Sequence, residues 1–101
     1  MPRAIYYVAY KLKKDADLSE FMLATKKLSA EIKSHHKGYV SWQQLRDGDT
    51  WADMMTFETL EDLNQFKQAA EKPSDTAKNF YSFIRLMTCK QHIFSVEKTH
   101  D

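Results

Sequence analysis

Cysteine, glycine and proline are all scarce in this chain of 101 residues. The sequence holds one cysteine, two glycines and two prolines. A single cysteine excludes an internal disulfide, a four-cysteine zinc site and an iron–sulfur cluster held by one chain. So little glycine and proline excludes collagen-like, linker-rich and low-complexity character. The length suits a single domain, which we expect to span residues 1–101.

Neither sign of charge is in excess. Lysine and arginine together number 15, aspartate and glutamate 14, and the formal net charge is +1. We therefore expect no nucleic-acid partner and no attraction to an anionic membrane. No apolar run approaches the ~20 residues that span a bilayer. The N-terminus also lacks the apolar segment of a signal peptide, so we expect a cytoplasmic protein.

Hydrophobic periodicity and turn signals predict the order of the elements. Asp17 followed by Glu20 resembles a capping box and predicts a helix start. The segment 47–49, Asp-Gly-Asp, is a strong hairpin signal. Pro73 ends the second helix, and Ser74 can cap a short third one. The predicted strands span 4–13, 39–46, 51–57 and 90–98, and the predicted helices run from 17 to 37, from 60 to 72 and from 74 onward.

This order, βαββαβ, predicts an α+β fold of the ferredoxin-like split type, with a four-stranded antiparallel sheet and the helices on one of its faces. The other face would also be apolar, because large side chains occupy both alternating phases of the strands. Such a patch exceeds what soluble monomers expose. We expect a homodimer with sheet packed on sheet about a two-fold axis. The alternative is a monomer whose tyrosines reach water.

Several segments resemble one superfamily. Residues 57–59 (Phe-Glu-Thr) before 60–63 (Leu-Glu-Asp-Leu) match an aromatic–acidic–Ser/Thr step into the second helix. Residues 51–53 (Trp-Ala-Asp) and the late strand at 92–96 add to the likeness. The chain thus resembles the dimeric α+β barrel superfamily, which includes the antibiotic-biosynthesis-monooxygenase-like domains, and looks like an uncharacterised branch of it. The resemblance implies the dimeric barrel fold.

The activities that the resemblance implies are diverse. Some members of the superfamily are cofactor-independent oxygenases of aromatic polyketides or quinols, some degrade haem, and others handle small ligands. The haem-degrading members use an asparagine on the first strand and a histidine on the second helix. Here the only asparagines are Asn64 and Asn79, and residues 60–84 contain no histidine. Haem degradation is therefore not expected.

Asp53 is a carboxylate in the middle of an apolar strand. If Phe57 points at the helices, strand alternation places Trp51, Asp53 and Met55 on the same side. In a cavity lined by aromatic and thioether groups, burial would raise the pKa of Asp53 and suit it to act as a general base. The alternative is an ion pair or a hydrogen bond to a tyrosine, which a buried carboxylate needs in any case.

His92 alternates with Phe94 and Val96, which predicts a buried position. It could bind a ligand or transfer a proton near neutral pH. The alternative is a core histidine whose hydrogen bonds are satisfied. In the expected strand order Asp53 and His92 would flank a cleft, with tyrosines of the first strand as its floor.

Six side chains could line an apolar ligand cavity: Tyr7, Trp42, Trp51, Met54, Met55 and Phe83. Aromatic residues make up 13% of the chain and there are five methionines, a composition that suits an adaptable pocket for a flat ring or an acyl chain. The alternative is that these residues form the core.

Three functions share this fold. In the first, the domain is a cofactor-independent monooxygenase or isomerase of an apolar or aromatic substrate, with Asp53 or His92 moving a proton and the substrate anion supplying the electron to oxygen. This hypothesis implies no metal and no other cofactor. In the second, it binds a hydrophobic molecule such as a fatty acid without catalysis. In the third, it is a structural homodimer without a ligand.

Overall fold

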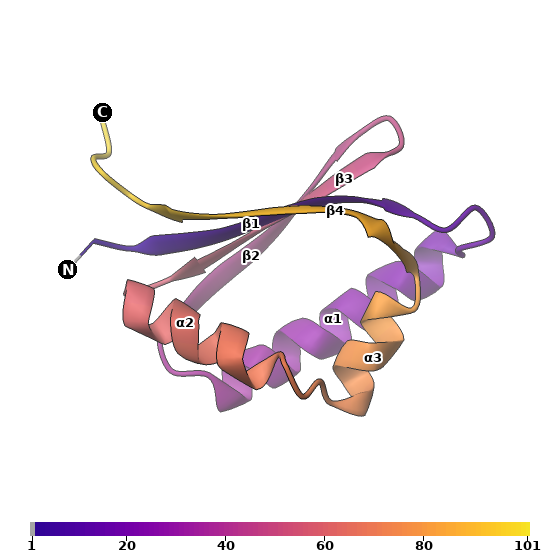
Figure 1. Cartoon of the computed structure of the whole chain (residues 1–101), viewed down its shortest axis with the longest axis horizontal. Helices are drawn as coiled ribbons and strands as arrows, with labels where there is room; N and C mark the ends of the chain where they lie inside the picture. Colours follow the sequence, from indigo (N-terminus) through magenta and orange to yellow (C-terminus); the bar gives the residue numbers. More distant parts are fainter. Residues whose placement is uncertain (1) are drawn as a thin grey trace.

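The computed structural model describes residues 2–101, and it has the ferredoxin-like architecture that the sequence predicts. A four-stranded antiparallel sheet forms one layer and the helices form a second layer on one of its faces (Figure 1). The elements are β1 (Ala4–Leu12), α1 (Leu18–His35), β2 (Tyr39–Asp47), β3 (Thr50–Phe57), α2 (Leu60–Ala69), α3 (Asp75–Tyr81) and β4 (Ile84–Ser95).

The strand order is β2-β3-β1-β4, so β1 and β3 are central and β2 and β4 are edges. Val8 of β1 pairs with Asp53 of β3, and Tyr7 pairs with His92 of β4. Paired residues of neighbouring strands point to the same face of a sheet. This register therefore decides which predicted site residues meet.

Each helix begins at the predicted capping residue. Asp17 accepts a hydrogen bond from the Glu20 amide at 3.0 Å, and the hydroxyl groups of Thr59 and Ser74 accept from the third amide after each of them at 3.1 Å. These bonds pair amides that have no partner within the first helical turn. Local sequence thus fixes where each helix starts under the sheet.

Two glycines take the positive φ that their turns require. Gly38, between α1 and β2, has φ +82°, and Gly48, in the β2–β3 hairpin, has φ +61°. Gly38 also lies against α2, where an added Cβ would overlap the Asp62 side chain. Its carbonyl accepts from the Glu58 amide at 2.8 Å. These contacts hold the connection between α1 and β2 against the start of α2.

The predicted bounds of the last strand are wrong. The sequence indicated 90–98, whereas β4 runs from Ile84 to Ser95. The cause is a break in register: Ala9 pairs with Lys90 but Lys11 with Arg85, which leaves residues 86–89 outside the regular ladder. The Thr88 hydroxyl accepts from the Lys11 amide at 2.9 Å and replaces a strand hydrogen bond there. Such a bulge hides the alternation that marks a strand.

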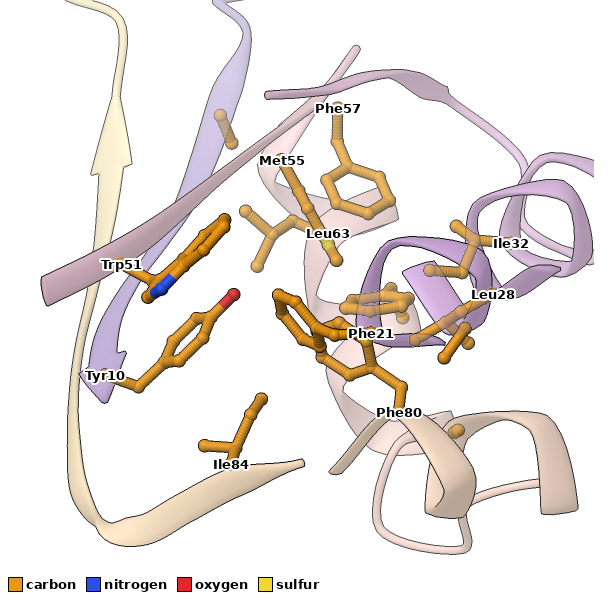
Figure 2. Packing of buried hydrophobic residues seen from close by; sticks show 14 residues of the cluster. Tyr10, Phe21, Leu28, Ile32, Trp51, Met55, Phe57, Leu63, Phe80 and Ile84 are labelled. Carbon is orange, nitrogen blue, oxygen red and sulfur yellow. The ribbon is translucent and has the colours of Figure 1, made fainter. Parts of the chain in front are cut away.

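The core lies between the sheet and the helices. Figure 2 shows Tyr10 and Trp51 extending from the sheet toward side chains of α1 and α3. Phe21 of α1 is fully buried, with its ring centroid 5.3 Å from Trp51 and 5.4 Å from Phe80. Buried side chains of this size contribute about 1.5–3 kcal/mol each. This packing holds α1 and α3 in place around the cavity described below.

The outer face of the sheet carries no helix. Its central positions are Ile5 and Tyr7 of β1 with Ala52 and Met54 of β3, as the register shows. Phe94 of β4 lies at one corner and is 51% exposed. Among residues 2–101, none of the helices is long and apolar enough to cross a membrane.

Candidate active site

A cavity of about 490 Å³ lies between the helix-facing side of the sheet and all three helices. Its volume falls within the range of about 300–1,000 Å³ typical of small-molecule sites. Most lining side chains are aliphatic or aromatic, and they include Val8, Leu28, Ile32, Met55, Phe66, Ala77, Phe80 and Ile84. The cavity therefore suits a largely apolar molecule.

Asp53 is the acidic group on the sheet wall of this cavity. It lies at mid-strand in β3, is only 2% exposed, and accepts a hydrogen bond from the Tyr10 hydroxyl at 2.9 Å. Among residues 2–101 no ion pair reaches it. Burial raises the pKa of Asp53 from 3.8 to about 6, while the Trp42 indole, Tyr10 and Gln44 oppose that rise. A carboxylate in this state can take up and release a proton near neutral pH.

Three phenols, those of Tyr6, Tyr10 and Tyr81, line the cavity together with the carboxylate. Burial, with the added charge of Asp53, raises the pKa of Tyr10 and of Tyr81, and it raises the pKa of Tyr6 to about 12. All three hydroxyl groups therefore stay protonated and can donate hydrogen bonds. Tyr6 donates to Oε1 of Gln91 at 2.9 Å.

The cavity reaches the surface along β4. Its lining residues on that strand include Leu86, Cys89 and Gln91, and all three are exposed. Partial burial and nearby Asp53 raise the pKa of the Cys89 thiol, so the thiol stays protonated at neutral pH. This side provides an entrance bordered by one aliphatic and two polar side chains.

A second part of the rim is polar and lies where α1 approaches the α2–α3 connection. The Ser74 hydroxyl donates to Oε2 of Glu31 at 2.7 Å and links the two. His36, at the end of α1, packs edge-on against Phe66 with ring centroids 5.3 Å apart. Burial lowers the pKa of His36, which favours its neutral form.

The structure brings together part of the predicted site. Asp53 and Met55 line the cavity, and so do Tyr6 and Tyr10 of the first strand, but not Tyr7. Trp42, predicted to line the cavity, is not among its lining residues; it packs on Phe80 at 5.3 Å, and its indole opposes the rise in the Asp53 pKa. Phe57 is buried on the same face, so the predicted alternation of β3 is confirmed.

Trp51 and Phe83 occupy the core. Their rings pack against Phe21 at 5.3 and 5.8 Å, and neither residue lines the cavity. For these two residues the alternative holds: they form part of the core and do not line the cavity.

His92 and Tyr7 lie on the opposite face of the sheet from Asp53. They pair with each other across β1 and β4, and their rings are 6.3 Å apart. His92 also stacks on Phe94 at 5.6 Å and is exposed. The expected buried position of His92 and the expected cleft between it and Asp53 are thus corrected. The helix-facing phase of β4 holds Cys89 and Gln91 instead.

Sequence reasoning missed Tyr81 and the exposed β4 residues of the entrance. Tyr81 is the last residue of α3, a short helix whose end the sequence does not define, and the bulge concealed the phase of Cys89 and Gln91. A hydrogen bond from a tyrosine to Asp53 was one of the predicted alternatives, and Tyr10 makes it, because Tyr10 pairs with Trp51 and therefore shares a face with Asp53. Among residues 2–101 no three His, Cys, Asp or Glu side chains are grouped to hold a metal ion.

Solved structures with the same fold cover almost the whole chain. SnoaB, a cofactor-independent oxygenase from Streptomyces nogalater, has a TM-score of 0.71 at 13% identity, over 98% of this chain and 97% of that one. A dimeric ferredoxin-like protein from an uncultured marine organism has a TM-score of 0.69 at 9% identity, over 100% and 93%. A protein from Caulobacter crescentus CB15, provisionally named an antibiotic biosynthesis monooxygenase, has a TM-score of 0.69 at 12% identity, over 96% and 92%.

No protein-family model matches the chain, and no curated protein matches it in sequence. The likeness at such low identity is one of fold. It confirms the resemblance to dimeric ferredoxin-like and antibiotic-biosynthesis-monooxygenase-like structures.

Proposed function

We propose that this domain is a cofactor-independent monooxygenase that binds an apolar or aromatic molecule in the cavity and uses Asp53 as its base. The observation that carries the proposal is a nearly fully buried carboxylate, without an ion pair among residues 2–101, on the wall of an otherwise apolar cavity. The shared fold with an oxygenase described as cofactor-independent supports the same reading.

The chemistry begins with a proton transfer. With a pKa of about 6, Asp53 is mainly ionised at pH 7.5 and is more basic than an exposed carboxylate. It removes a proton from an acidic carbon of the substrate, and the carbanion gives one electron to O₂. The substrate radical and superoxide then join in a C–O bond. Loss of a second C–H proton and cleavage of the O–O bond leave a ketone and water, so a CH₂ group and O₂ become C=O and H₂O.

We further propose that the domain is a homodimer whose sheets pack through their outer faces. The apolar residues at the centre of that face and the dimeric ferredoxin-like neighbour support this arrangement. In such a dimer Tyr7 and His92 would lie at the interface rather than at the site. The cytoplasmic location stays a prediction from the sequence.

Oxygen uptake with anthrone, a tricyclic ketone with an acidic CH₂ group, tests the oxygenase proposal. We expect uptake of one O₂ per anthrone, above the uncatalysed rate, with wild-type protein. Asp53→Asn should lose at least 100-fold in rate, since a positioned base contributes about 10²–10⁴-fold. Asp47→Asn, an exposed position at the end of β2, should keep the wild-type rate. Equal rates for the wild type and Asp53→Asn would remove Asp53 as the base.

A second candidate function is binding without catalysis, which the mainly apolar lining and the open β4 side favour. Native mass spectrometry of freshly purified protein would then detect a retained hydrophobic molecule such as a fatty acid. Quenching of tryptophan fluorescence by added oleate should be equal for wild type and Asp53→Asn. In that case neither protein would accelerate oxygen uptake.

A further inference from the structure

The indole nitrogen of Trp42 is a buried hydrogen-bond donor without a partner. Among the side-chain nitrogen and oxygen atoms of residues 2–101 that are fully buried, Nε1 of Trp42 alone lacks a hydrogen bond. Leaving a buried donor unpaired is unfavourable, and native proteins rarely do so without a reason. We therefore expect this N–H to bind an acceptor when the charge of a neighbouring group changes.

The place of Trp42 in the sheet identifies that acceptor. Trp42 pairs with Met55 on β3, and the next pair on the same face joins Gln44 to Asp53. The indole ring is held edge-on against Phe80 at 5.3 Å. Trp42 and Asp53 are diagonal neighbours on the same face of the sheet, a spacing that long aromatic side chains can bridge. Tyr10 donates to Oδ1 of Asp53, and one N–H of the Gln44 amide donates to the Thr25 hydroxyl.

We propose that Trp42 is a positioning residue for Asp53. Its indole N–H binds the carboxylate once that carboxylate is ionised, and with the Tyr10 hydrogen bond it holds the base in place on the cavity wall. This inference rests on the proposed role of Asp53 as a base. An ionised carboxylate accepts at both oxygens, whereas a protonated one presents a hydrogen at one of them. The Trp42 hydrogen bond therefore favours the basic form, in a place where no cation does so.

The other titratable groups that face Asp53 do not compete for this role. They are Tyr6 and Tyr10 of β1, Tyr81 of α3 and Cys89 of β4. Each has a raised pKa and stays neutral near pH 7. Glu31, His35 and His36 of the α1 segment line the same cavity, but they are not among the groups that shift the pKa of Asp53.

Carbon-13 NMR titration of the Asp53 carboxyl, in ligand-free protein, tests the proposal without any need for turnover. Trp42→Phe keeps an aromatic ring against Phe80 and removes the N–H. We expect it to raise the midpoint of the Asp53 titration by about one pH unit, a tenfold change in proton affinity. Trp51→Phe is the matched control, because Trp51 is the other tryptophan on this face and does not act on the Asp53 pKa. An unchanged midpoint in Trp42→Phe would overturn the proposal.

A second measurement uses the wild-type protein and so does not depend on whether the variant folds. The Trp42 indole proton should move downfield as pH rises, with the same midpoint as Asp53, and a pH-independent indole signal would also overturn the proposal. In the oxygen-uptake assay the acidic limb of the rate profile should move upward in Trp42→Phe by the same amount. If wild type shows no uptake, the proposed function fails, while the two NMR titrations still decide the role of Trp42.

Discussion

At the scale of single residues, Asp53 is the position where sequence and structure agree most usefully. A carboxylate between Ala52 and Met54 breaks an apolar strand, and that break identified it before any contact was known. The structure identifies Tyr10 as the tyrosine that binds Asp53, which was one of the predicted alternatives, and among residues 2–101 it places no cation beside the carboxylate. Asp53 is therefore not part of an ion pair among residues 2–101, and its carboxyl group can change its charge near neutral pH.

The buried carboxylate predicts a particular dependence of stability on pH. Because its pKa rises from 3.8 to about 6 on folding, the folded state holds the proton more tightly than the unfolded chain between these values. Ionised Asp53 therefore costs stability above about pH 6, and the cost disappears as pH falls toward 4. Asp53→Asn, which cannot ionise, should lose on the order of 2–3 kcal/mol relative to wild type between pH 7.5 and pH 4.

Urea unfolding of both proteins across this pH range measures the difference. Asp47→Asn serves as the control, because Asp47 is exposed. A stability difference between wild type and Asp53→Asn that stays constant with pH would mean that Asp53 is not shifted by burial.

His92 shows where single-residue inference fails. Its alternation with Phe94 and Val96 was real, but alternation alone does not say which phase faces the helices. That assignment depends on the pairing of Tyr7 with His92, which is a long-range contact. A two-sided apolar sheet gives the sequence no polar phase from which to choose.

At the scale of elements, the helix starts were predictable and the last strand was not. Caps act within three residues, so Asp17, Thr59 and Ser74 could be identified directly from their neighbours. The start of β4 depends instead on a bulge opposite Tyr10, where the register to β1 shifts. Non-local pairing of this kind leaves no local signature.

The two glycines offer a matched test of close approach between elements. Both have positive φ, which costs an alanine about 1–2 kcal/mol. Gly48 has no atom within 4 Å of an added Cβ, whereas Gly38 would meet the Asp62 side chain. We expect Gly38→Ala to destabilise by about 1–3 kcal/mol more than Gly48→Ala, the typical cost of overpacking. Urea denaturation followed by circular dichroism measures both, and equal losses would contradict the tight contact.

At the scale of the whole molecule, the single chain exposes more surface than its mass requires. Its accessible area is 7157 Å² at 11.9 kDa, whereas a monomer of that mass exposes ~5,900 Å². Part of the excess is the outer face of the sheet, which the sequence already marked as apolar on both phases. A second copy packed on that face would cover it.

A pair of equally exposed residues distinguishes this interface from the rest of the surface. Phe94 on the outer face is 51% exposed and Leu23 on α1 is 52% exposed. Phe94→Lys should convert the dimer to a monomer at micromolar concentration, because it would bury an unpaired ammonium group. Leu23→Lys should stay dimeric. Light scattering coupled to size exclusion reads both masses, and a monomeric wild type, or a dimer unaffected by Phe94→Lys, would reject the sheet-to-sheet arrangement.

The bulge at residues 86–89 has a consequence for what the domain can accommodate. It forms part of the cavity wall through Leu86 and Cys89, yet it lies outside the regular ladder between β1 and β4. A molecule in the cavity would therefore contact a stretch of β4 whose backbone is not fixed by ladder hydrogen bonds, with regular pairing on either side of it. In β4, residues 84–85 and 90–95 thus anchor the strand to β1, while Leu86 and Cys89 between them border the cavity.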